Sequence, residues 1–98
     1  MALSGGIVID AATAAATYAF EILDGASMSF VGYGFSGSDA ITLQAKTSNG
    51  AFADYVDATT AQTVALSLTG NALIVSGPFL GRWSKGATTG AVGLRVAY

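Results

Sequence analysis

The chain has 98 residues, of which ten are charged, none is cysteine and none is histidine, and its formal net charge is −2. A chain of this length holds one domain, and the missing thiols and imidazoles exclude disulfides, thiolate chemistry, most structural zinc sites and the commonest general base. The four basic residues form no stripe that could neutralise several phosphates, so we expect no nucleic-acid partner.

The composition also constrains the surface. Hydrophobic residue types make up 52% of the chain and charged types 10%, against about 25% charged residues in an average soluble domain. Much of the surface must therefore consist of Ala, Ser, Thr, Gly and Asn. Such a surface suits burial against neighbouring proteins, but it is equally compatible with a solvated surface on which small polar residues replace charges.

The first segment, Met1 to Asp10, has no Lys or Arg before its apolar run, and Asp10 interrupts that run. We therefore expect no signal peptide. No uncharged apolar stretch reaches bilayer-spanning length, so we expect no transmembrane helix and no membrane partner. Residues 1–98 are expected to form one β-sandwich domain, with residues 1–6 as a candidate N-terminal arm.

Thirteen glycines divide the chain into short runs rich in Val, Ile, Leu, Phe, Thr and Tyr, which is the pattern of an all-β sandwich or barrel. The Ala- and Thr-rich segment 10–17 has no wide apolar stripe and is interpreted as a loop with strand edges or a helical turn. The expected strands, in chain order, are 5–10, 17–23, 27–34, 40–47, 52–56, 62–68, 71–76, 79–84 and 91–97.

A β-hairpin is predicted over residues 41–56. Ile41, Leu43 and Ala45 alternate with polar residues, which places them on one face of a strand. Asn49-Gly50 can take the two positive φ angles of a type I′ turn, whose twist matches that of the flanking strands. We therefore expect a two-residue turn at these positions.

The strand count and the single proline indicate the architecture. Pro78 cannot donate a ladder hydrogen bond and is expected between strands 71–76 and 79–84. Eight or nine short strands in one domain imply two facing sheets, and the long connections between sheets favour jelly-roll or Greek-key winding over a meander. The expected fold is an all-β, two-sheet sandwich of one of these types.

Two carboxylates are the first candidates for chemistry. Asp54 and Asp57 lie three residues apart and could form an acid–base pair or bind a hard cation. The other interpretation is that Asp54 faces solvent and Asp57 opens a turn over residues 57–60. We favour the second, and expect neither a metal site nor a cofactor.

The remaining polar residues suggest no catalytic group. Without histidine, a nucleophilic hydroxyl would need a lysine as its base, but Ser84 and Lys85 should point to opposite faces of a strand. Glu21 and Asp24 flank a strand end and are expected to guard it from edge-to-edge pairing. We therefore expect that the protein is not an enzyme.

Tyr33 and Phe35 are two candidate interface residues. Strict alternation over residues 28–35 places Phe30 with Met28 on one face and sends Tyr33 and Phe35 to the other. One set should belong to the core. The other set forms either a sheet–sheet contact at a bend made by the glycines of this segment or an intersubunit patch, and the patch is favoured.

Arg82 and Trp83 are the other two candidate interface residues, because arginine and tryptophan are favoured anchors of protein–protein contacts. The alternative is that Trp83 belongs to the core and that its strand is edged by charges.

The order of these elements resembles a group of small jelly-roll proteins of tailed bacteriophage virions. The likeness covers most of the chain, although Asn49 stands where that group more usually has Asp. The matching pieces are Gly25-Ala-Ser-Met28, the hairpin over 41–56, Gly77-Pro-Phe-Leu80, and Arg82-Trp-Ser-Lys-Gly86 before Ala91-Val-Gly-Leu-Arg-Val96.

This resemblance implies a virion structural protein that decorates or cements the capsid. It would bridge neighbouring copies of the major capsid protein as a homotrimer, on the capsid surface, after residing in the host cytoplasm during assembly. A tail, neck or fibre-tip module of the virion is an alternative. The hairpin over 41–56 also resembles a strand pair of discoidin-like and other carbohydrate-binding jelly rolls, so a glycan-binding module is a further alternative.

Overall fold

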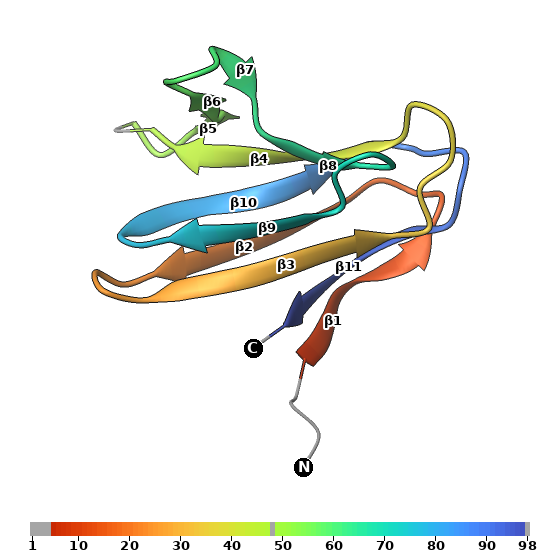
Figure 1. The fold of residues 1–98 in the computed structure, drawn as a ribbon, viewed down its shortest axis with the longest axis horizontal. Helices are drawn as coiled ribbons and strands as arrows, with labels where there is room; N and C mark the ends of the chain where they lie inside the picture. The colour runs from red at the N-terminus through yellow and green to blue at the C-terminus, as the bar shows by residue number, and fades with distance from the viewer. Residues whose placement is uncertain (1–4, 48, 98) are drawn as a thin grey trace.

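The structure, a computed structural model, describes residues 5–47 and 49–97, and these contain strands and connecting loops without a helix (Figure 1). The predicted arm over 1–6 lies partly outside these residues, and its last two positions belong to the first strand. The strands are β1 (Gly5–Ala12), β2 (Ala16–Ile22), β3 (Ser27–Tyr33), β4 (Ala40–Lys46), β5 (Phe52–Asp54), β6 (Val56–Asp57), β7 (Gln62–Thr63), β8 (Ala65–Ser67), β9 (Ala72–Ser76), β10 (Phe79–Lys85) and β11 (Val92–Ala97).

The strands form two antiparallel sheets and a small hairpin. One sheet has four strands in the order β1-β11-β3-β9. The other has five, in the order β2-β10-β4-β5, with β8 also paired to β4. The hairpin β6–β7 stands away from both sheets at the upper edge of Figure 1. None of the described residues lies in a helix able to cross a bilayer.

The pairing is nested in the way that defines a jelly roll. β1 pairs with β11, β2 with β10, β3 with β9 and β4 with β8, always antiparallel. A long two-stranded ribbon is thereby rolled so that alternate strand pairs fall in opposite sheets. Of the two windings that the sequence left open, the structure has the jelly roll.

The predicted strands are largely confirmed, with one region of difference. The expected strand 52–56 is divided into β5 and β6, and the expected strand 62–68 into β7 and β8. Both divisions fall where the chain leaves the edge of β4: Tyr55 N donates to Leu43 O at 2.9 Å, and Leu43 N donates to Val64 O at 2.9 Å. The backbone of Leu43 therefore binds both ends of the segment from Tyr55 to Val64, which forms the β6–β7 hairpin.

The turn of the β4–β5 hairpin is one residue longer than predicted. Lys46 pairs with Phe52, Thr47 N donates to Ala51 O at 2.7 Å, and Gly50 N donates to Thr47 O at 3.0 Å. Three residues, 48–50, thus connect the strands, and Gly50 has φ +85°. The predicted two-residue type I′ turn is wrong, because a three-residue loop needs its glycine at the last loop position.

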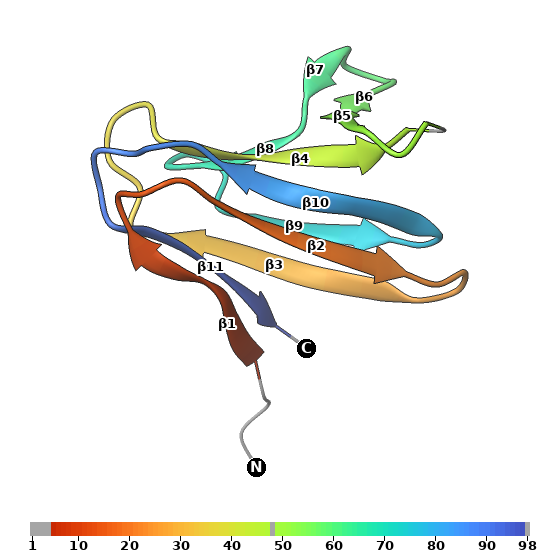
Figure 2. The same ribbon diagram turned by 180° about the vertical axis from the view of Figure 1, so that it is seen from behind.

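The loops gather at two ends of the sandwich. The β1–β2, β3–β4 and β10–β11 loops lie at the right of Figure 1, and the β2–β3, β4–β5 and β9–β10 turns lie at the left; Figure 2 shows the same division from behind. Pro78 lies in the β9–β10 turn, as predicted, after a cis Gly77-Pro78 peptide bond. The Ala- and Thr-rich segment forms strand edges around a short loop at 13–15.

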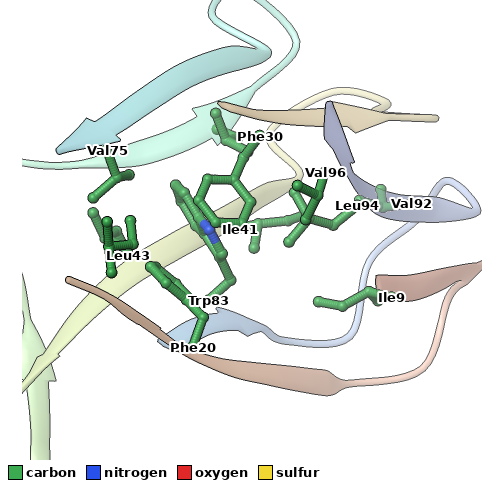
Figure 3. Close-up of a cluster of buried hydrophobic side chains, with 12 residues drawn as sticks. Ile9, Phe20, Phe30, Ile41, Leu43, Val75, Trp83, Val92, Leu94 and Val96 are labelled. Carbon is green, nitrogen blue, oxygen red and sulfur yellow. The ribbon is translucent and has the colours of Figure 1, made fainter. Parts of the chain in front are cut away.

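The core lies between the sheets and consists of side chains from both (Figure 3). Trp83 of β10 and Phe30 of β3 are fully buried, and their rings meet edge to face at 5.4 Å between centroids. Phe20 of β2 packs against Phe30 at 4.8 Å. These aromatic side chains fill the space between the two sheets and fix their separation.

Candidate functional site

Tyr33 lies on the outer face of the four-stranded sheet, as alternation predicts. It pairs with Gly93 of β11, and its ring covers that glycine: a Cβ added to Gly93 would lie 2.5 Å from the Tyr33 Cζ and Oη atoms. The same face carries Val31, Arg95 and Ile7, which follow one another across three paired strands. Tyr33 thus belongs to a largely uncharged face centred on Arg95, and its role at an interface stays a prediction.

Phe35 does not share that face, which corrects the prediction from strict alternation. Gly34 has φ +83°, and this left-handed residue reverses the side-chain alternation after β3. The Phe35 ring turns back over Gly32, where an added Cβ would lie 2.5 Å from the Phe35 Cζ, and it packs against the core. Phe35 is half-buried and is a poor anchor for a partner protein.

Trp83 also lies in the core, in agreement with the alternative interpretation of this residue. Its side chain is fully buried, and β10 places it between Leu43 and Tyr18 of the neighbouring strands. The indole Nε1 has no hydrogen-bond partner among the described residues. A partner protein could not reach this ring without opening the sandwich.

Arg82 points to the outer face of the five-stranded sheet, where it is tied into a polar row. Its Nε donates to Gln44 Oε1 at 2.7 Å, and Gln44 Nε2 donates to Asp54 Oδ1 at 2.9 Å. The guanidinium also lies 4.3 Å above the centre of the Phe52 ring. The amide of Gln44 therefore links a cation and an anion across three strands, and a cation–π contact orients the arginine further.

Asp54 and Asp57, the candidate acid–base pair, make separate local hydrogen bonds. Asp54 accepts the hydrogen bond from Gln44, and Asp57 Oδ1 accepts from Thr59 N at 2.7 Å and Thr60 N at 3.4 Å. Asp57 therefore opens the turn between β6 and β7, as predicted. Among the described residues, no cluster of three or more His, Cys, Asp or Glu side chains could hold a metal ion.

Lys85 is buried at the loop end of the sandwich, while Ser84 faces outward, so the two side chains do point to opposite faces. The Lys85 Nζ donates to Ala12 O at 2.5 Å and to Val92 O at 2.9 Å. A buried ammonium needs such acceptors, because desolvation would otherwise be costly. The lysine thereby joins the end of β1 to the start of β11.

Asp39 is the second buried charge and was not singled out by the sequence. Its carboxylate accepts hydrogen bonds from Gly90 N at 2.8 Å, Thr89 N at 2.9 Å and Ser36 N at 3.2 Å, and the Thr89 hydroxyl lies at 3.1 Å. The backbone N–H groups of Thr89 and Gly90 lower the pKa of Asp39 below its ordinary value of 3.8. One carboxylate thus fastens the β3–β4 loop to the β10–β11 loop.

We expect the stability that Asp39 contributes to be fully present above pH 3.8 and to be lost as the pH falls through its lower folded-state pKa. Asp39→Asn should lower the urea midpoint at pH 7, since an amide N–H₂ would face a backbone N–H. The difference from wild type should shrink below about pH 4. Urea titrations from pH 2.5 to 7 measure this, with Asp24→Asn in the exposed β2–β3 loop as the control; a constant difference at all pH values would contradict it.

A groove of about 260 Å³ separates the free edge of β9 from the excursion around β5 to β7. Side chains from both sheets line it, among them Tyr55, Asp57, Leu73, Val75 and Phe79. The Tyr55 ring meets Phe79 edge to face at 5.5 Å and is itself 41% exposed. The groove is thus lined mainly by apolar residues, with the single carboxylate of Asp57 among them.

Comparison of the chain with protein-family models, with curated proteins and with solved structures found no match. A glycan site would need exposed aromatic faces beside a few polar groups. Among the described residues, Tyr55, at 41% exposure, is the one exposed aromatic side chain.

Proposed function

We propose that this jelly roll is a non-enzymatic virion structural protein that decorates or cements a bacteriophage capsid by bridging major capsid subunits as a homo-oligomer, with a homotrimer as the expected form. The observation that carries the proposal is a charge-poor, partly apolar surface on a jelly roll. The resemblance of the strand order to small phage jelly-roll proteins supports the same assignment.

The fold buries two of the ten charged side chains and leaves several large apolar side chains on the surface. Asp39 and Lys85 are buried, so eight charged side chains remain exposed or half-buried. Within residues 5–47 and 49–97, large apolar side chains are exposed at seven positions, namely Ile7, Leu23, Tyr55, Val56, Leu68, Ile74 and Leu80. Charged residues are depleted in the centres of protein–protein interfaces because their desolvation is costly, so this surface fits contact with other subunits.

The outer face of the four-stranded sheet is the surface that we assign to the capsid. Ile7, Arg95 and Val31 form a continuous row on it, and Tyr33 lies one row away. Arginine and tyrosine at the centre of an apolar patch are the residue types that anchor interfaces. The outer face of the five-stranded sheet differs, because its Arg82 is already engaged by Gln44 and Phe52.

The test is binding of the purified chain to isolated capsids that lack it, followed by cryo-electron microscopy of the complex. Val31→Glu should abolish binding, because it places a carboxylate directly opposite Arg95 at the centre of the assigned face and so removes that arginine as an anchor. Ala19→Glu, an exposed position on the opposite sheet, should leave binding unchanged. Loss of binding in the second variant alone, or a wild-type chain without capsid affinity, would contradict the proposal.

A further inference from the structure

The jelly roll has four free sheet edges, and they are not equally protected. Natural sheets guard their edges with charges, bulges or short strands, since a regular edge invites another strand. β1 contains two register shifts and the exposed Asp10, and β2 exposes Glu21. The edge formed by β5 and β8 consists of two three-residue pieces. Each of these three edges therefore carries a guard.

The fourth edge, β9, carries none of these guards. It is a five-residue strand, Ala-Leu-Ile-Val-Ser, without a charge or a proline, and it keeps an unbroken register with β3 over its whole length. Ile74 at its centre is 66% exposed on the outer face. An isolated edge of this kind would promote aggregation, so its regularity fits a strand that is covered in the working protein.

The register shows which backbone groups of β9 are free. Gly32 N donates to Asn71 O at 2.8 Å, and in an antiparallel pair the bonded positions alternate. Leu73 and Val75 therefore direct their N–H and C=O groups toward β3. The N–H and C=O groups of Ala72, Ile74 and Ser76 point to the open edge. Water can bind these groups in the isolated chain, but among protein segments it is an extended strand that pairs with all of them in one regular ladder.

We propose that β9 pairs antiparallel with β9 of a second copy, about a two-fold axis at Ile74. Ile74 would then exchange both backbone hydrogen bonds with Ile74 of the other copy, and Ala72 would do so with Ser76, giving about six bonds. This register places apolar side chains of one copy beside apolar side chains of the other and brings no like charges together. The four-stranded sheets of the two copies become one continuous eight-stranded sheet.

The groove beside β9 supports the choice of a second copy. Leu73 and Val75 point inward and line that groove with Tyr55 and Phe79. In the paired register, Val75 of the second copy lies opposite Leu73, so each copy adds apolar side chains at the mouth of the groove of the other. Tyr55, at 41% exposure, lies in the region that the contact would cover.

This contact goes beyond the proposed function and does not depend on it. A two-fold axis makes an isologous interface, which gives a dimer, or a hexamer where it joins two trimers. Capsid binding and the β9 contact are therefore separable. A chain that binds capsids without the contact would contradict only this inference, and a dimer without capsid affinity would contradict only the function.

The chain has no native cysteine, so any cross-link formed by a single introduced cysteine joins the same position of two copies. We expect Ile74→Cys to form covalent dimers in high yield with a short bis-maleimide, because the two Cα atoms would lie about 5.5 Å apart. Ile7→Cys is the matched control, because Ile7 is exposed to a similar degree, 60% against 66%, on the same face but on the guarded strand β1. Its two thiols would be seven strand spacings apart, roughly 34 Å, and should not be joined.

Sedimentation equilibrium at 100 µM gives the second measurement. The wild-type chain should have the mass of a dimer or of a hexamer. Ile74→Lys should lower it to that of a monomer or of a trimer, respectively, and Ile7→Lys should leave the mass unchanged. Circular dichroism confirms that each variant is folded. A wild-type monomer or trimer, or equal cross-linking at positions 74 and 7, would overturn the inference.

Discussion

Trp83→Ala is expected to lower the free energy of unfolding by about 3–5 kcal/mol, the largest effect of any single side chain in the core. The indole is fully buried between the sheets and touches the Phe30 ring edge to face. The cavity would lie where both sheets depend on the same ring, so neighbouring strands could not close it without separating from their partners. The total free energy of unfolding of a domain of this size is only about 5–15 kcal/mol.

The measurement is urea unfolding followed by far-ultraviolet circular dichroism, since the substitution removes the single tryptophan. Trp83→Phe is the matched control. It keeps an aromatic ring in the core and removes an indole N–H that has no hydrogen-bond partner among the described residues. The decrease in the free energy of unfolding should therefore be less than half that of Trp83→Ala. Equal losses in the two variants would show that the indole packing is not what stabilises the sandwich.

Gly34→Ala is expected to cost about 2–4 kcal/mol, from left-handed backbone strain together with overpacking. Gly34 has φ +83°, and an added Cβ would lie 2.1 Å from the carbonyl oxygen of Ala91. That atom belongs to the last residue of the β10–β11 loop, which is held in place by the neighbouring Asp39 contacts with Thr89 and Gly90. The methyl group could be accommodated only if the two loops moved apart.

Gly37→Ala separates the left-handed backbone strain from the overpacking. Gly37 lies in the same loop with φ +60°, but an added Cβ would meet no heavy atom within 4 Å. Its cost should be that of the left-handed conformation alone, about 1 kcal/mol. The comparison is made by thermal and urea unfolding of both variants. A loss at Gly37 as large as that at Gly34 would show that the close approach to Ala91 is unimportant.

The strands that cross the core were predictable because each carries its own period-two signal. The alternation of Ile41 and Leu43 in β4, and of Val92, Leu94 and Val96 in β11, places these residues inward without reference to any other strand. The divided strands β5 to β8 were not predictable. Their breaks depend on Leu43, whose backbone bonds both Tyr55 and Val64 from a different part of the chain.

The candidate surfaces were predictable only in part. Tyr33 could be placed on an outer face from its parity with Phe30, whereas Phe35 could not, because one left-handed glycine reversed the alternation. The β9 edge carried no signal in isolation, since an apolar five-residue run fits a central strand as well as an edge. Asp39 gave no signal either, because its partners lie about 50 residues away.

Taken by itself, the sequence determined the all-β class, the approximate strands and the scarcity of charge, because composition and period-two alternation are local properties. Only the tertiary structure decided that the winding is a jelly roll, that Trp83 lies in the core and that β9 is an unguarded edge. Strand order and burial follow from contacts between segments far apart in the chain, and no local pattern encodes which neighbour a strand will have.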